Sequence, residues 1–390
     1  MRDRINILKL FAVCAPGLET FTAQELTYLG LDPHRATDPG SNSDFEDNGG
    51  VEFVGTFDDI CRANLQLRTA SRILVRLGEF YTTTFSELRK KASHLSWERY
   101  LKPGQPVSIR VTCHKSRLYH SDAVAERIAG AISDRLKKPV PATKIKDGIS
   151  SENIQLVVVR FFHDLCTISI DTSGELLHRR GYRLETAKAP IRETLAAGLI
   201  LASGWDKKSP LMDPFCGSGT IPIEAALIAG NISPGGNRKF AFMDWPDYSE
   251  GKVDRIVGSK MAASQGNYPL IAASDRDEGA IQIARSNADR AGLTDQVQFS
   301  CQAVSAIMPP AVTGWIVTNP PYGIRVSANK DLRNLYAQIG KVLRIKCLHW
   351  HFAILCSDLS LLHQTGLHFQ DTFILKNGGI KVRLAIGVVE

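Results

Sequence analysis

Four consecutive residues, Asn319-Pro320-Pro321-Tyr322, combine groups that can hold a planar amine. They follow the apolar run 314–317, which predicts a short buried strand. Two consecutive prolines cannot continue that strand, so the Asn319 amide, the Pro320 carbonyl and the Tyr322 ring stand on a stiff corner at its carboxyl end. Ligands of open α/β sheets bind at that edge. Taken alone, the run is equally compatible with a proline-rich turn that buries a tyrosine.

A second ligand-binding pattern lies upstream, in residues 211–226. An apolar strand is expected to end at Asp213, and a glycine-rich turn then leads into a helix. Glycines let a ligand approach the backbone, and a helix N-terminus offers free N–H groups. The dinucleotide fingerprint needs a third glycine where this chain has Pro222, which favours a ligand without a pyrophosphate. The candidate ligand-binding residues of this turn are Asp213, Pro214, Gly217, Gly219 and Thr220.

Another apolar strand, 270–275, is expected to end in acid. Asp275 is the candidate for binding ribose, because a carboxylate can accept both hydroxyl hydrogen bonds. Asp277 is better placed to cap the helix expected at 278–291. Capping is the commoner role for either acid alone. Three strand ends that carry Asp213, Asp275 and Asn319 are hard to attribute to capping, and together they predict one ligand site.

The rest of the chain must position this site. Its 390 residues, 44% hydrophobic, suffice for two or three domains. No apolar run approaches the roughly 20 residues of a membrane span, and the N-terminal residues predict a first strand rather than a signal peptide. The 8 cysteines include no Cys-x-x-Cys pair, so we expect a reduced, cytoplasmic protein without a metal site.

Charge is distributed unevenly. Residues 1–61 carry 4 Lys and Arg against 11 Asp and Glu, whereas residues 62–146 carry 18 against 6, a balance of +12 within an overall +7. A compact basic segment indicates a surface that faces nucleic acid. Solvated helix faces on an ordinary basic domain are the alternative interpretation.

Strands are expected at 5–13, 51–54, 107–111, 154–159 and 166–170, and helices at 57–77 and 121–138. On the helix expected at 57–77, Arg68, Arg72 and Arg76 would share one face and could contact RNA phosphates or only water. The loop after residue 111 places Lys115 and Arg117 beside an aromatic residue, as suits RNA backbone contact and stacking. Strands and helices without a glycine-rich loop indicate a small α+β binding module.

A polar connector, 171–190, leads to a helix expected at about 191–203. It contains Arg179, Arg180 and Arg183, which would extend the RNA path.

These motifs together resemble the S-adenosylmethionine-dependent class I methyltransferases, and more narrowly the THUMP-containing RNA guanine-N2 methyltransferase family. The resemblance rests on 213–220, 274–277, 319–323, 177–183 with 189–190 and Glu193, 242–246 and 377–378. It implies an α/β chain with four parts: a ferredoxin-like part (1–60), a THUMP-type RNA-binding domain (61–170), a linker (171–190) and a Rossmann-like methyltransferase domain with a mostly parallel seven-stranded sheet (191–390).

The resemblance also implies roles for the site residues. Asp213 and the glycines would contact the methionine moiety of S-adenosylmethionine, Asp275 its ribose, and Asn319 to Tyr322 the target base. The family usually has an acid after the third strand that binds the adenine amine. This chain has none at 300–305, where Gln302 offers a neutral acceptor instead.

The implied reaction is methyl transfer to guanine N2 in structured RNA, with 23S rRNA as the substrate and tRNA as the alternative. Asn319 and the Pro320 carbonyl would accept the two N–H bonds of the amine, while Tyr322 stacks on the flipped base. Three other interpretations stay open: an adenine-N6 methyltransferase of DNA or RNA, a nucleotide-dependent oxidoreductase, and a non-catalytic RNA-binding protein.

Overall fold

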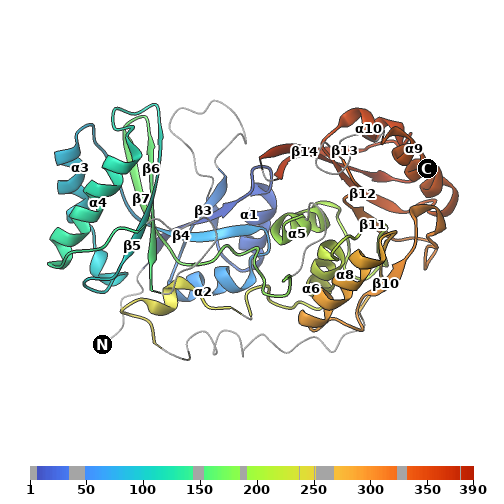
Figure 1. Cartoon of the computed structure of the whole chain (residues 1–390), viewed down its shortest axis with the longest axis horizontal. Coiled ribbons are helices and arrows are strands. Elements are labelled where there is room, and N and C mark those ends of the chain that lie inside the picture. The colour runs from blue at the N-terminus through green and yellow to red at the C-terminus, as the bar shows by residue number, and fades with distance from the viewer. Residues whose placement is uncertain are drawn as a thin grey trace.

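Two seven-stranded sheets with their helices form the two halves of the molecule, at opposite ends of its long axis (Figure 1). The computed structural model describes residues 7–34, 49–143, 153–184, 191–236, 238–249, 251, 268–322, 332–377 and 379–390. Most of the turn-rich stretch 38–50, and residues 189–190, 323 and 378 of the family motifs, lie outside the described residues.

The N-terminal sheet has the strand order β2-β3-β1-β4-β7-β6-β5. It is antiparallel throughout except for the parallel pair β5 and β6. The long strand β4 pairs with both β1 and β7, so one sheet runs through the ferredoxin-like and THUMP-type regions. Its elements are β1 (Leu8–Cys14), α1 (Glu19–Tyr28), β2 (Pro33–His34), β3 (Gly50–Gly55), α2 (Phe57–Gln66), β4 (Ala70–Tyr81), α3 (Phe85–Ser93), β5 (Val107–His114), α4 (Ser121–Leu136), β6 (Gln155–Phe162) and β7 (Leu165–Asp171).

The five strands expected in this half are present as β1, β3, β5, β6 and β7, and the helix expected at 121–138 is α4. The single long helix expected at 57–77 is wrong. Helix α2 stops at Gln66, where the extended backbone of Leu67 turns the chain into β4. Arginines four residues apart share a face in a helix, but residues 72 and 76 also share a face in a strand with its period of two. The buried residues Ile73 and Val75 of β4 lie on the other face of that strand.

The C-terminal sheet has the order β10-β9-β8-β11-β12-β14-β13. Its first five strands are parallel, and β14 and β13 complete it in antiparallel pairing. This agrees with the expected mostly parallel sheet of a class I methyltransferase domain. Its elements are α5 (Glu193–Ala202), β8 (Leu211–Asp213), α6 (Thr220–Ala229), β9 (Ile271–Asp275), α8 (Glu278–Arg290), β10 (Gln298–Cys301), β11 (Trp315–Thr318), α9 (Arg333–Lys346), β12 (His351–Cys356), α10 (Leu359–Gln364), β13 (Asp371–Asn377) and β14 (Ile380–Val388).

The two halves share their cores. Leu18 and Phe21 of the first half pack in the hydrophobic cluster of the C-terminal sheet. In the reverse direction, Phe240, Phe242 and Trp245, which follow α6, are buried in the core of the N-terminal half. Apolar side chains exchanged in both directions hold the N-terminal half against the C-terminal domain.

Candidate active site

Three polar strand ends meet at one edge of the C-terminal sheet. Strands β9, β8 and β11 are neighbours and run parallel, so Asp275, Asp213 and Thr318 all lie at the same carboxyl edge. Thr318 donates its hydroxyl hydrogen bond to Asp213 Oδ1 at 2.6 Å, and Asp275 Oδ2 accepts one from the Gly217 N–H at 3.1 Å. The structure therefore brings together the three segments expected to form one ligand site.

Asp213 is the most buried of these acids, with 1% of its surface exposed. Burial raises its pKa to about 7; hydrogen bonds from Thr318 and the Phe215 N–H oppose the shift, and the nearby Asp275 carboxylate adds to it. Because its negative charge is costly in this position, a cation bound beside the carboxylate would be strongly favoured. Its surroundings therefore suit a ligand with a positively charged group.

The turn after β8 is shaped for close approach of a ligand. Gly217 has a φ of +51°, and no atom outside its chain neighbours lies within 4 Å of the position that a Cβ would take. Gly219, with a φ of +82°, directly precedes α6, whose first residue is the buried Thr220. Pro222 lies in the first turn of α6, where a missing N–H has no helical partner to lose.

The Asn319-to-Tyr322 corner follows β11 directly. Asn319 Oδ1 is buried and has no hydrogen-bond partner among the described residues. Tyr336 of α9 donates to the Pro321 carbonyl at 3.4 Å, and Asn377 of β13 donates to the Tyr322 hydroxyl oxygen at 3.3 Å. A buried amide oxygen without a partner costs free energy, so a ligand that donates a hydrogen bond to it would be stabilised.

Gln302 follows β10, which pairs in parallel with β9 and places Cys301 opposite Asp275. The Gln302 N–H donates to the Asp275 carbonyl at 2.9 Å, which holds this half-buried residue beside the acid. Cys301 is exposed at the same edge.

The expectation that Arg68, Arg72 and Arg76 line an RNA-facing helix is wrong: Arg68 and Arg72 are buried, and the half-buried Arg76 pairs with Glu52 at 3.2 Å. Arg68 is only 9% exposed, and its guanidinium donates to the Ile232 and Leu227 carbonyls of the C-terminal half. The buried Arg72 forms an ion pair with Asp171. The Arg68 and Arg72 guanidinium groups are therefore enclosed by protein and cannot reach RNA phosphates.

The three arginines of the connector 171–190 differ in their exposure to solvent. Arg180 is buried: its Nη2 donates to the Arg68 carbonyl at 2.6 Å, and its Nε lies 3.5 Å from Glu224 Oε1. The half-buried Arg183 pairs with Glu193 at 3.0 Å. Of the three candidates for the RNA path, only Arg179 is exposed, with 44% of its side chain accessible.

A buried polar chain that the motifs do not reveal joins this connector to the glycine turn. Asn287 of α8 donates to the Ser218 carbonyl at 2.9 Å, and Arg290 donates to Asn287 Oδ1 and to the Tyr182 carbonyl. Tyr182 in turn donates to Glu224 at 3.0 Å. The signal available in the sequence was a Glu in the apolar helix α6, because a carboxylate is rarely buried unless it is paired.

Lys115 and Arg117 are exposed, as expected, on the turn after β5. That turn contacts the β6–β7 turn, because Asp164 Oδ1 accepts the Arg117 N–H at 2.6 Å. Motif reasoning missed the neighbouring aromatic group, in which His114 stacks on Phe162 with ring centroids 5.4 Å apart. We call Lys115, Arg117, His114, Phe162 and His163 the tip cluster.

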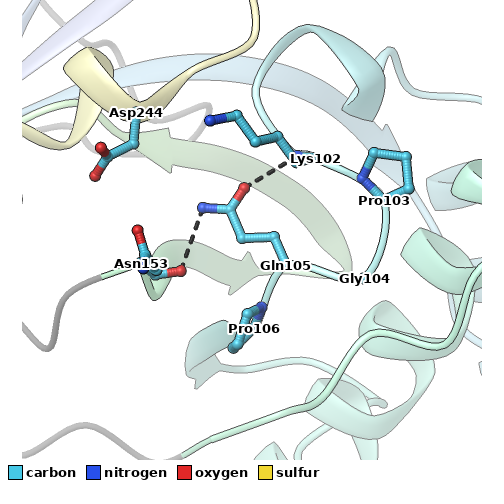
Figure 2. Close-up of a pocket in the computed structure, with 7 residues that line it drawn as sticks. All are labelled: Lys102, Pro103, Gly104, Gln105, Pro106, Asn153 and Asp244. Atoms are coloured by element: carbon cyan, nitrogen blue, oxygen red, sulfur yellow. Dashed lines mark hydrogen bonds between the residues drawn. The ribbon is translucent and has the colours of Figure 1, made fainter.

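A cavity of about 280 Å³ lies elsewhere, between the loop 102–106 and the segment that follows α6 (Figure 2). Gln105 bridges it by accepting from the Lys102 N–H and donating to the Asn153 carbonyl. Asp244 faces it from the other side. None of the strand-end residues lines this cavity, so it is separate from the candidate active site.

Within the described residues, no group of three or more His, Cys, Asp or Glu side chains is arranged to hold a metal ion. The described helices also include none that is long and apolar enough to cross a membrane.

Three family models match consecutive parts of the chain. Residues 9–74 match the RlmL ferredoxin-like domain, residues 82–171 the THUMP domain, and residues 180–386 the RMKL-like methyltransferase domain. The last match alone covers more than half of the chain.

Individual proteins agree with these matches. The chain is 32% identical to slr0064 of Synechocystis sp., named "Putative RNA methyltransferase", over 96% of this chain and 95% of that protein. It is 33% identical to the ribosomal RNA large subunit methyltransferase K/L of Psychromonas ingrahamii over 96% of this chain, which spans 49% of that longer protein. The crystal structure of SMU.472 complexed with SAH is 32% identical, with a TM-score of 0.86 and 98% coverage of both chains.

Proposed function

The chain belongs to the RMKL-like methyltransferase family, and we propose that it transfers a methyl group from S-adenosylmethionine to the N2 amine of a guanosine in structured RNA. The proposed substrate is 23S ribosomal RNA, in line with the K/L relatives, about half of whose length this chain spans. Transfer RNA is the second candidate substrate.

The residues at the sheet edge fit the cofactor. S-adenosylmethionine supplies a methyl group on a positively charged sulfur and also carries an ammonium group. Asp213 lies where a cation would relieve the cost of its buried charge, and the open space at Gly217 lets a ligand approach the backbone. The Asp275 carboxylate accepts one hydrogen bond from the Gly217 N–H, and its remaining lone pairs could accept hydrogen bonds from the ribose hydroxyls. Pro214, Gly219 and Thr220 complete the turn, and Gln302 would accept a hydrogen bond from the adenine amine.

The main support for an amine as the methyl acceptor is the buried Asn319 Oδ1, which has no hydrogen-bond partner among the described residues. Together with the Pro320 carbonyl it would accept both N–H bonds of the target amine. That arrangement favours a pyramidal nitrogen and stabilises the positive charge that develops on it. Tyr322 would stack on the flipped base, with Pro321 keeping the corner stiff. The work of these residues is positioning and dipole stabilisation, so no strong general base is required.

RNA contact is assigned to the exposed basic groups. We place it at the tip cluster and at Arg179, because cations beside stacked aromatic rings suit an RNA backbone and an unpaired base. Arg68, Arg72 and Arg180 are withdrawn from this role. We also move the first domain boundary, expected after residue 60, to the end of β4, because residue 60 lies inside α2.

Nucleoside mass spectrometry of rRNA and tRNA from a strain lacking this gene tests the proposal. We expect N2-methylguanosine to disappear from 23S rRNA and to return with the wild-type gene. The Asn319→Ala gene should not restore it, although the purified variant should still bind S-adenosylhomocysteine nearly as well, because the proposed contact of Asn319 is to the target amine. Loss of N2-methylguanosine from tRNA instead would identify tRNA as the substrate. Loss of N6-methyladenosine would identify adenine as the target base, and unchanged RNA would refute the proposal.

A further inference from the structure

We propose that Asn377 is a positioning residue for Tyr322, and that the turn Pro16–Gly17 of the N-terminal half sets where Asn377 lies. The inference rests on the proposed function, since it concerns the ring that would stack on the target base. It adds that the ferredoxin-like part of the N-terminal half orients the target-base site through the β13–β14 hairpin.

The first step is the contact between Asn377 and Tyr322. Asn377 Nδ2 donates to the Tyr322 hydroxyl oxygen at 3.3 Å, across 55 residues of sequence, and both side chains are half-buried. Stacking depends on the tilt of the ring, and a hydrogen bond at its far end restricts that tilt. The carbonyl of Pro321, directly before Tyr322, accepts from the Tyr336 hydroxyl at 3.4 Å. The catalytic corner is therefore held from two separate elements, α9 and β13.

The second step concerns what holds β13. It is the edge strand of its sheet and pairs only with β14 among the described strands. Its outer side meets the N-terminal half instead: the Lys376 N–H donates to the Pro16 carbonyl at 3.2 Å, and the Phe373 and Phe21 rings lie 5.6 Å apart, edge to face. Figure 1 shows this hairpin reaching from the C-terminal domain toward α1.

Gly17 shows how close this approach is. A Cβ on Gly17 would lie 2.2 Å from the Ile374 carbonyl oxygen and 2.8 Å from the Leu375 side chain. Only a residue without a side chain allows the turn and the strand to meet at this distance. Because Asn377 follows these residues on the same strand, a shift of the turn moves the group that holds Tyr322.

The first experiment measures the Tyr322 ring directly, by ¹⁹F NMR of protein labelled with 3-fluorotyrosine. The chain has 9 tyrosines, and the signal missing from the Tyr322→Phe variant identifies Tyr322. We expect Asn377→Ala to shift this signal and lower the rate of methyl transfer at saturating RNA about tenfold, as expected for one hydrogen bond that matters in the transition state. Thr372→Ala, an exposed change on the same strand, should leave both unchanged.

The second experiment perturbs the turn from the other half. Gly17→Ala should shift the Tyr322 signal, because its Cβ collides with β13. Gly30→Ala is the matched control: its φ of +74° resembles the +94° of Gly17, but no atom lies within 4 Å of the added Cβ. The control carries similar backbone strain without the collision, and should leave the signal in place.

Methyl transfer is measured with labelled S-adenosylmethionine and total rRNA from a strain lacking this gene. A Tyr322 signal that stays in place in Asn377→Ala overturns the positioning role, and one that moves equally in Gly17→Ala and Gly30→Ala overturns the role of the turn. If the wild type transfers no methyl group to RNA, the proposed function fails while the NMR result still decides the positioning.

Discussion

Binding of S-adenosylhomocysteine should tighten as pH rises from 6 to 8, because of Asp213. Burial raises the pKa of this carboxyl to about 7, so in the free protein it is largely protonated below that pH. The ammonium group of the ligand is attracted to the carboxylate and not to the neutral acid. Binding below pH 7 must therefore release a proton, and the apparent dissociation constant rises as pH falls.

The magnitude follows from the fraction of ionised Asp213. We assume that only the ionised form binds. The apparent dissociation constant then exceeds that of the fully ionised protein by a factor of about 11 at pH 6 and about 1.1 at pH 8. Binding is therefore about tenfold tighter at the higher pH. Residual affinity of the protonated form would reduce this ratio.

Calorimetric titrations at pH 6, 7 and 8 measure the effect, with Asp213→Asn as the matched control. The amide oxygen of that variant can still accept from Thr318, but the residue no longer titrates. The variant keeps every other group that titrates in this range, including Glu193, whose pKa burial also raises to about 7, and the titration of the ligand itself. The ratio of wild-type to variant affinity therefore isolates Asp213. A ratio that does not change between pH 6 and 8 would refute the reasoning.

Three further experiments test other parts of the structure. Arg180→Ala removes a paired guanidinium from the buried Glu224 carboxylate and should destabilise the protein by about 3 kcal/mol in denaturant titration, whereas exposed Arg179→Ala should stay within about 0.5 kcal/mol. Equal effects of the two would contradict the burial argument. Lys115→Ala combined with Arg117→Ala should weaken RNA binding and lower its salt dependence, measured by filter binding at several ionic strengths, while binding of S-adenosylhomocysteine stays unchanged. Asn287→Ala leaves the carbonyl at the glycine turn unpaired and should lower stability by about 1–3 kcal/mol while weakening S-adenosylhomocysteine binding in calorimetry; unchanged affinity would show that Asn287 does not position the turn.

Local chemistry accounts for what was predictable at the active site. The prolines at 320–321, the glycines at 217 and 219 and the acids that end β8 and β9 impose conformations and ligand preferences that act within a few residues. The parallel sheet then brings these segments together, because carboxyl ends of parallel strands share an edge. The meeting of Asp213, Asp275 and Asn319 at one edge is therefore confirmed, while their roles toward ligands stay predictions.

The arginines show where this reasoning failed. Arg68, Arg72 and Arg180 have the same side chain as exposed Arg179. Spacing predicted a surface position for the first two, and the gathering of arginines in the connector predicted it for the others. Their environment depends on a partner far along the chain: Asp171 for Arg72, the end of α6 for Arg68, and Glu224 for Arg180. A guanidinium offers five donors, so it can satisfy buried carbonyls and carboxylates as readily as RNA phosphates. Residue type and spacing do not distinguish the two.

By itself, the sequence determined the class of the catalytic domain, the three polar strand ends that are predicted to bind a ligand, and the basic character of residues 62–146, because each depends on residues that are close in the chain. Only the tertiary structure decided which cations face solvent, that the two halves exchange apolar side chains, and that Asn377 reaches Tyr322. Those features depend on contacts between residues tens to hundreds of positions apart, and packing of the whole chain selects them.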